Sequence, residues 1–563
     1  MSRAPFRPAT LVVVRLVPLL LSLVAPLAAQ EARNIAAHVK FLASDLLEGR
    51  GAGARGGELA AEYIAAQFRL AGAEPAGENG TYFQRVPLVG IETASDARLE
   101  AASLRFRWLE DWVGLSQTQT ALAEIQSELV FAGHGIVAPE YGWDDFKDAD
   151  VRGKVLLLFT NEPAAPLHPP DGQPGPAGAA TRASSSGQPP DDPKFFDGRA
   201  LTYYGRWTYK FEQALRKGAL GALLIHTTPT AGYGWDVVRN SWGREEPYGK
   251  LAPGAPALSL AGWLTGESGN RLLGVAGRSV DELLKASQSR DFRPIPLQLP
   301  IAARLPARVR EIETRNVAAL VRGSDPALSS EAVIFTAHWD HLGIGRPVHG
   351  DAIYNGAVDN ATGCGVLLEL ARAWAALPRK PRRSALFLAV TAEEGGLRGS
   401  QYYARHPLVA PDKTAVAINY DALYPFGRTG DVVVTGAERT ALWPLVQQVA
   451  RRLDLAIQPD PRPEQGLYFR SDHFSLARAG IPAFSIKMGN EFLGKPAGFG
   501  DRVFADYNSK HYHQPSDEFR EDWDFSGVEQ MARFGLAIGI EAASQKKLPE
   551  RMKLGPGAVS GSP

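Results

Sequence analysis

Two segments near the start of the chain carry apolar residues at helical spacing, at residues 34–47 and 58–71. The apolar side of the first segment is formed by Ile35, Val39, Leu42 and Leu46. A glycine-rich stretch at 48–57 separates the two. It lacks the Gly-Lys-Ser/Thr ending of a phosphate-binding loop and no strand precedes it, so we interpret it as a tight connection between two helices.

From residue 115 to about 305 the pattern changes to short apolar runs bounded by turn residues, which are typical of strands. Examples are 128–136, 153–159 and 218–225. Residues 164–193 interrupt this region with Pro, Gly, Ser and Ala, a composition that buries too little apolar surface to order itself. The pattern predicts a separate β-rich domain over 115–305 with a mobile loop at 164–193.

Beyond residue 306, short apolar strands alternate with amphipathic helices such as 363–376. The predicted strands are 316–321, 332–336, 385–390, 415–419 and 483–487. This alternation indicates an α/β domain over 306–545, with a mixed, largely parallel central sheet flanked by helices. Residues 546–563 are polar and contain Pro and Gly, which predicts a flexible tail.

The N-terminus has the pattern of a signal peptide. Arg3 and Arg7 precede an apolar run at 16–24 that is too short to cross a bilayer, and small residues follow at 25–29. We expect removal of residues 1–29 and a periplasmic or secreted protein with no stable membrane anchor. An uncleaved anchor is the alternative, which Arg15 disfavours because it breaks the first apolar run.

Composition adds three constraints. A chain of 563 residues is too long for one compact core, so two or three domains are expected. Lys plus Arg equals Asp plus Glu, at 61 each, so the charge gives no sign of a nucleic-acid partner. Cys364 is the single cysteine, so no intramolecular disulfide can form, and its apolar surroundings predict a buried thiol rather than a nucleophile. Oligomeric state stays open.

Two histidines and three carboxylates stand out between residues 338 and 513 as candidate metal ligands. They are His338, Asp359, Glu394, Asp421 and His513. Such a set can hold two zinc ions per chain if one carboxylate bridges them, and two metals about 3.5–4 Å apart recur in hydrolytic sites. The set therefore predicts a hydrolase of peptides or amides.

The positions of these residues relative to the strands support the metal hypothesis. His338, Glu394 and Asp421 each follow a predicted strand, and sites in open α/β sheets lie outside the carboxyl ends of strands. Taken singly, each has a simpler interpretation: a surface histidine, a solvated Glu-Glu pair, or a helix cap at Asp359. Their joint occurrence in this order favours the metal site.

Each candidate receives a specific role. Asp359 would bridge, Asp421 would join His338 on one metal, and Glu394 would join His513 on the other. Asp340 would accept the second ring N–H of His338. Three further residues are predicted to act near the metals. Glu393 would act as general base on the metal-bound water, Tyr512 would donate to the developing oxyanion, and Arg470 begins a polar cluster through His473 that either lines the pocket or caps a helix.

In these motifs the chain resembles the co-catalytic dizinc exopeptidase family, which includes bacterial leucyl aminopeptidases, glutamate carboxypeptidase and the transferrin receptor. The matching motifs are at 337–343, 356–363, 391–400, 418–421 and 512–517. The resemblance implies the ligand and base roles given above. It also implies that residues 30–114 belong to the peptidase domain, and that 115–305 is an inserted protease-associated domain.

The resemblance implies a metallo-aminopeptidase that acts on peptide substrates. A carboxypeptidase or dipeptidase on the same scaffold is the alternative, and would need cationic groups to hold a terminal carboxylate. A one-zinc glutaminyl cyclase, a non-enzymatic receptor relative and a dinuclear phosphoesterase are less consistent with five retained ligands and the Glu393-Glu394 pair.

Overall fold

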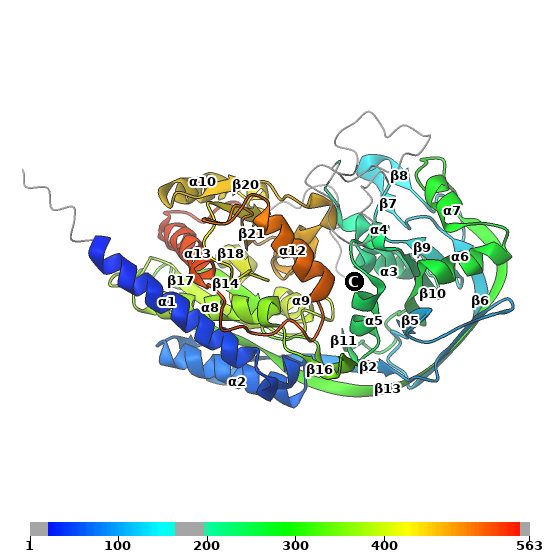
Figure 1. The fold of residues 1–563 in the computed structure, drawn as a ribbon, viewed down its shortest axis with the longest axis horizontal. Helices are drawn as coiled ribbons and strands as arrows, with labels where there is room; N and C mark the ends of the chain where they lie inside the picture. The colour runs from blue at the N-terminus through cyan, green and yellow to red at the C-terminus, as the bar shows by residue number, and fades with distance from the viewer. Residues whose placement is uncertain (1–20, 164–195, 197, 199, 552–563) are drawn as a thin grey trace, which may run out of the picture.

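The computed structural model describes residues 21–163, 196, 198 and 200–551, with side chains from Glu31 onward. Most of the predicted signal peptide, the 164–193 loop and most of the predicted tail lie outside the described residues. Figure 1 shows two parts side by side. A helix-rich part contains the start of the described chain and helix α13 (Ser526–Ser544), and a β-rich part is joined to it along one edge by the long strand β13 (Ile295–Val321).

The helix-rich part is built on a mixed sheet. Its strands in spatial order are β2 (Phe83–Thr93), β13, β17 (Ser384–Val390), β14 (Ala332–His338), β18 (Thr414–Tyr420), β21 (Ala483–Met488), β19 (Asp431–Thr435) and β20 (Ala456–Gln458). The four neighbouring strands β17, β14, β18 and β21 run parallel to one another. The predicted α/β class is confirmed, and all five predicted strands are present.

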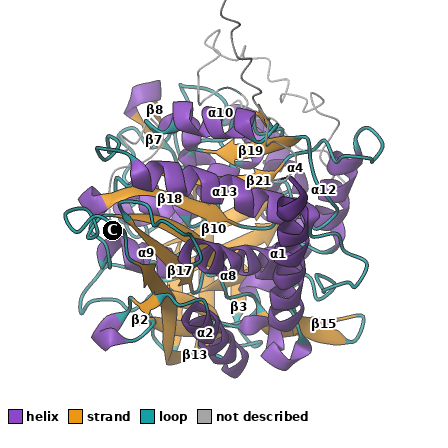
Figure 2. Ribbon diagram, turned by 90° about the vertical axis from the view of Figure 1, so that its left-hand side faces the viewer, coloured by secondary structure: helices purple, strands orange, loops and turns teal. Residues whose placement is uncertain are grey.

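Alternate residues of these strands face opposite layers of the structure, because strand side chains alternate. On β14, Val333, Phe335 and Ala337 pack with helices α1 (Leu21–Leu42), α2 (Arg55–Leu70), α8 (Thr362–Ala375), α10 (Trp443–Arg452) and α13 (Ser526–Ser544). Figure 2 shows α8 and α13 lying across this face of the sheet. The opposite face is covered by α9 (Arg398–Arg405), α11 (His473–Arg478) and tyrosines 203, 204 and 209 of the β-rich part.

The β-rich part contains a second sheet that shares β13. Its order is β4 (Leu104–Phe106), β3 (Arg98–Ala101), β13, β6 (Leu122–Phe131), β9 (Val155–Phe159), β10 (Gly221–His226), β12 (Leu260–Thr265) and β5 (Trp112–Leu115). Helices α3 (Trp207–Arg216), α5 (Trp235–Trp242), α6 (Gly266–Val275) and α7 (Val280–Ala286) accompany it. Because β3 and β4 pair into this sheet, it draws on residues from 98 onward, before the predicted start at 115.

The glycine-rich stretch at 48–57 forms the predicted tight connection between two helices, although the second helix begins three residues earlier than predicted. A 3-10 helix occupies Asp45–Arg50 and α2 already begins at Arg55. A Cβ on Gly56 would lie 1.8 Å from the Leu47 carbonyl oxygen, so only glycine allows this close approach of backbone. Among the helices that the structure describes, none has both the length and the apolar character needed to cross a bilayer.

Candidate metal centre

All six predicted site residues from His338 to His513 converge at one end of the central sheet. His338 is the last residue of β14, Asp421 directly follows β18, and Glu393 and Glu394 follow β17. Asp359 lies in a π-helical turn at Ala357–Ala361 that leads into α8. His513 follows α12 (Phe499–Lys510). The carboxyl ends of parallel strands thus bring together residues that are up to 175 positions apart in the chain.

Asp359 lies between the two histidines. One of its oxygens is 3.2 Å from His338 Nε2, and the other is 3.8 Å from His513 Nε2. His338 Nε2 is also 3.5 Å from an Asp421 oxygen, and His513 Nε2 is 3.0 Å from a Glu394 oxygen. This is the pairing expected of two metal positions that share Asp359.

The donor set fits metal cations. Imidazole nitrogen and carboxylate oxygen are the ligands that zinc takes, and the ligand atoms of His338, Asp359 and Glu394 lie within 4.8 Å of one another, as do those of His338, Glu393 and Asp421. Four carboxylates in this largely buried space repel one another, which favours compensation by bound cations. Glu393 lies within 4.0 Å of His338 Nε2, beside the predicted ligands.

Burial and neighbouring charges shift the pKa values of Glu393 and Asp421 in opposite directions. Burial raises the pKa of Glu393 well above 4.5, and the carboxylates of Glu394 and Asp421 add to the rise while His338 opposes it. Burial disfavours the charged form of Asp421 too, but Lys487 and His338 outweigh burial and hold its pKa below the usual range. Of these two carboxyls, Glu393 is therefore the one that more readily holds a proton.

Asp340 acts differently from the prediction. The Nδ1 of His338 lies 3.2 Å from the Asp340 backbone oxygen, whereas the Asp340 carboxylate is 3.8 Å from it. The carboxylate instead accepts the backbone N–H of Glu393 at 3.1 Å and of Glu394 at 3.4 Å. The backbone path after β14 thus turns the Asp340 side chain toward the Glu-Glu pair, whose orientation it holds.

Asp517 is a positioning residue that the sequence reasoning missed. Its carboxylate accepts the backbone N–H groups of Val358 at 3.0 Å and Asp359 at 3.1 Å, and the Tyr507 hydroxyl donates to it at 3.1 Å. Burial raises the pKa of Asp517 to about 7. It lies in the same Gln-Pro-Ser-Asp motif that follows His513, and that motif was the available signal.

Histidine 341 and Cys364 are buried beside the predicted ligands. His341 Nδ1 is 2.6 Å from a Glu394 oxygen, and the Cys364 thiol donates to the His338 carbonyl at 3.1 Å. Burial raises the pKa of Cys364 to about 12, so this thiol is not a nucleophile. The prediction of a buried, unreactive cysteine agrees with this position.

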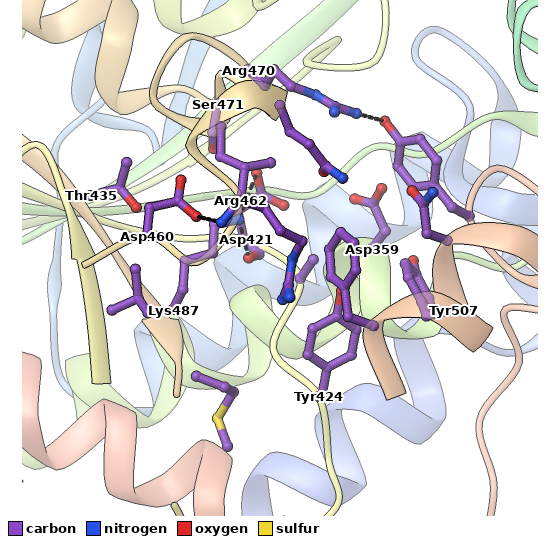
Figure 3. A pocket seen from close by; sticks show the side chains of 18 of the residues that line it. Asp359, Asp421, Tyr424, Thr435, Asp460, Arg462, Arg470, Ser471, Lys487 and Tyr507 are labelled. Atoms are coloured by element: carbon purple, nitrogen blue, oxygen red, sulfur yellow. Dashed lines mark hydrogen bonds and ion pairs between the residues drawn. The ribbon is translucent and has the colours of Figure 1, made fainter. Parts of the chain in front are cut away.

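A cavity opens beside the site, lined by apolar and charged side chains. The apolar ones include Val433, Leu467, Met488 and Phe504. Figure 3 shows Arg462, Arg470 and Lys487 around Asp421 and Asp359. Arg470 and Ser471 line the cavity, whereas Asp472 and His473 are buried, so only the first half of this polar cluster reaches the pocket.

Tyr512 lies at the cavity wall next to His513. Its hydroxyl oxygen accepts a hydrogen bond from Arg470 at 2.8 Å, which is the dashed line from Arg470 in Figure 3. Burial raises the pKa of Tyr512 above its usual range, so the hydroxyl keeps its proton. A tyrosine that accepts from arginine still has its own hydrogen to donate.

Residues 316–537 match the model of peptidase family M28. A probable zinc metalloprotease of Leptosphaeria maculans is 36% identical over 105 residues, which are 19% of this chain and only 22% of that protein.

Two solved structures are also similar. An aminopeptidase from Aneurinibacillus sp. strain AM-1 has 19% identity and a TM-score of 0.50, with 93% of this chain and 95% of that chain covered. A peptidase M28 precursor from Shewanella amazonensis SB2B has 16% identity and a TM-score of 0.48, with 95% and 100% covered. At this identity, the first of these similarities shows the shared fold.

The matched segment contains every residue of the metal centre described above. The five-residue donor set, its placement at the strand ends and the family match agree with one another. The part of the chain that carries the metal centre, residues 316–537, is therefore similar to peptidase family M28, and its donor set fits the metal ion of a metallopeptidase.

Proposed function

We propose that this protein is an aminopeptidase that removes N-terminal residues from peptides with two zinc ions per chain. His338, Asp359 and Asp421 would hold one ion, and His513, Asp359 and Glu394 the other. The observation that carries the proposal is the position of Asp359, with one oxygen toward each histidine. When bound, the metals would lower the pKa of water and polarise the scissile carbonyl.

Glu393 is placed to move the proton. Its carboxyl is largely buried beside the ligands, and burial raises its pKa well above the usual range of a glutamate, which makes it a stronger base. It would take a proton from the attacking water and return it to the leaving amine. Tyr512, held by Arg470, would donate to the oxygen that gains charge on the carbonyl.

The hydrogen bonds of the cationic side chains in the cavity favour recognition of a free amine over recognition of a terminal carboxylate. Three cationic side chains line the cavity, and each already donates to a protein oxygen. Arg470 bonds Tyr512 at 2.8 Å, Arg462 bonds Asp501 at 3.0 Å, and Lys487 bonds the Asp421 carbonyl at 2.8 Å. Side chains committed to these bonds are less available to hold a terminal carboxylate, which supports a substrate that binds through its N-terminus.

The place of action is part of the same proposal. The positively charged start, the short apolar run and the small residues before position 30 support export and removal of residues 1–29. The mature enzyme would then act on peptides in the periplasm or outside the cell. The β-rich part would serve as a protease-associated domain that shapes access to the cavity.

A peptide library tests the proposal. The protein without residues 1–29 is loaded with zinc and incubated with peptides of which half are N-acetylated, and products are identified by mass spectrometry. Shortening from free N-termini, with acetylated peptides intact, is the expected result. Loss of C-terminal residues from both halves would replace the proposal with a carboxypeptidase.

A further inference from the structure

Helix α5 of the β-rich part reaches the metal centre. One side of this helix is anchored in the core of its own part, where Trp242 packs against Phe211 and Trp263 with ring centroids 5.6 and 6.2 Å apart. The residues just before Trp242, Asn240 and Ser241, contact the segment that carries His513. A rigidly held helix turn therefore contacts a predicted ligand from the other part.

The contact of Ser241 is made to the imidazole ring itself. Its Oγ lies 3.0 Å from His513 Nδ1, while the Nε2 of the same ring faces Glu394 and Asp359. If Nε2 binds a metal, Nδ1 must carry the ring hydrogen and can donate it to Ser241. A partner of this kind fixes the tautomer and the ring orientation of a metal-binding histidine.

Asn240 contacts the backbone of the same segment. Its Nδ2 donates to the His513 carbonyl and to Gln514 Oε1, both at 3.4 Å. His513 has a φ of 56°, a left-handed conformation that is unfavourable for a residue with a side chain and persists where surrounding contacts enforce it. Asn240 and Ser241 supply such contacts on both the backbone and the ring.

We propose that Ser241 and Asn240 are positioning residues for His513, so that the β-rich part sets the zinc affinity of the half-site formed by His513 and Glu394. The inference rests on the proposed two-zinc site and adds a function to the β-rich part beyond shaping access. Among the hydrogen bonds of the described residues, none joins α5 to His338 or Asp421, which form the other half-site.

The test measures zinc affinity rather than activity alone. Metal-free wild-type protein and the variants Ser241→Ala, Ser241→Thr and Asn240→Ala are titrated with zinc in competition with a chromophoric chelator. Ser241→Ala is expected to weaken one of the two binding steps about 10- to 100-fold and to leave the other unchanged. Ser241→Thr keeps a hydroxyl and should restore most of the affinity. At saturating zinc, kcat of Ser241→Ala should return toward wild type.

Ser287→Ala is the matched control, because Ser287 is a buried serine of the same part whose Oγ lies 3.2 Å from His134 Nε2, away from the metal centre. It should leave both zinc affinities unchanged. The inference would be overturned if Ser241→Ala and Asn240→Ala both bound two zinc ions with wild-type affinity, or if both zinc-binding steps were weakened equally. The proposed function would stand in either case. A wild-type protein that binds fewer than two zinc ions would overturn the two-zinc proposal and this inference with it.

Discussion

Arg50 links the N-terminal segment to the backbone around the metal centre. The guanidinium is 1% exposed and donates to four backbone carbonyls. These belong to Leu42 at 2.5 Å, Asn355 at 2.6 Å, Gly356 at 2.8 Å and Trp339 at 2.8 Å. Trp339 adjoins His338, and Gly356 precedes Asp359 by three residues. Replacing Arg50 with Met keeps much of the volume and removes all four donors.

The magnitude follows from those four acceptors. A buried acceptor that loses its partner costs about 1–3 kcal/mol, so four give roughly 4–12 kcal/mol before relaxation. Burial lowers the pKa of Arg50, so the wild type already bears a desolvation cost that Met relieves. With that relief and water entry to some carbonyls, we expect Arg50→Met to lower the free energy of unfolding by about 4 kcal/mol, a large share of a typical total of about 5–15 kcal/mol.

Urea unfolding of the zinc-free protein, followed by tryptophan fluorescence, measures this loss. Arg55→Met is the matched control, because Arg55 is exposed and pairs with Glu48 at 3.1 Å on the surface. It should change stability by less than about 1 kcal/mol. If Arg50→Met unfolds within about 1 kcal/mol of the wild type, the buried hydrogen bonds do not stabilise the fold and the reasoning fails.

Three further predictions concern the site. Glu393→Gln should lower kcat by about 10²–10⁴-fold while both zinc ions stay bound, as read by steady-state kinetics and elemental analysis; metal loss in this variant would make Glu393 a ligand instead. Because burial raises the pKa of Glu393, its carboxyl in the zinc-free protein should titrate well above 4.5 when carboxyl NMR signals are compared with those of Glu393→Gln, and a titration near 4.5 would contradict this. Asp517→Ala frees the backbone N–H groups of Val358 and Asp359, so zinc affinity should fall about 10–100-fold in a chelator competition, and unchanged affinity would remove Asp517 from the positioning role.

The sequence predicts those parts of the fold and the site that depend on residues close to one another along the chain. The strands β14, β17 and β18 are buried and largely apolar, and the polar residues at or just after their ends mark the edge of the sheet. The sequence therefore predicts candidates such as His338 and Asp421 from their residue types, their order along the chain and their positions after strands.

The sequence pattern does not predict the positioning residues, because their partners are distant in sequence. Arg50 bonds Trp339 across 289 positions, Ser241 meets His513 across 272, and Asp517 holds Val358 across 159. The spacing of Asp340 two residues after His338 suggested a contact with the ring, but the backbone direction after β14 decides where that carboxylate points. The strands β3 and β4 have four and three residues, too short to give a clear pattern before position 115.

The most direct test of the account is a crystal structure of the zinc-loaded protein with anomalous diffraction data collected at the zinc edge. Two peaks are predicted, about 3.5–4 Å apart, with Asp359 between them, His338 and Asp421 on one and His513 and Glu394 on the other. A single peak, or two peaks that do not share Asp359, would contradict the two-zinc site on which the proposed peptidase mechanism rests.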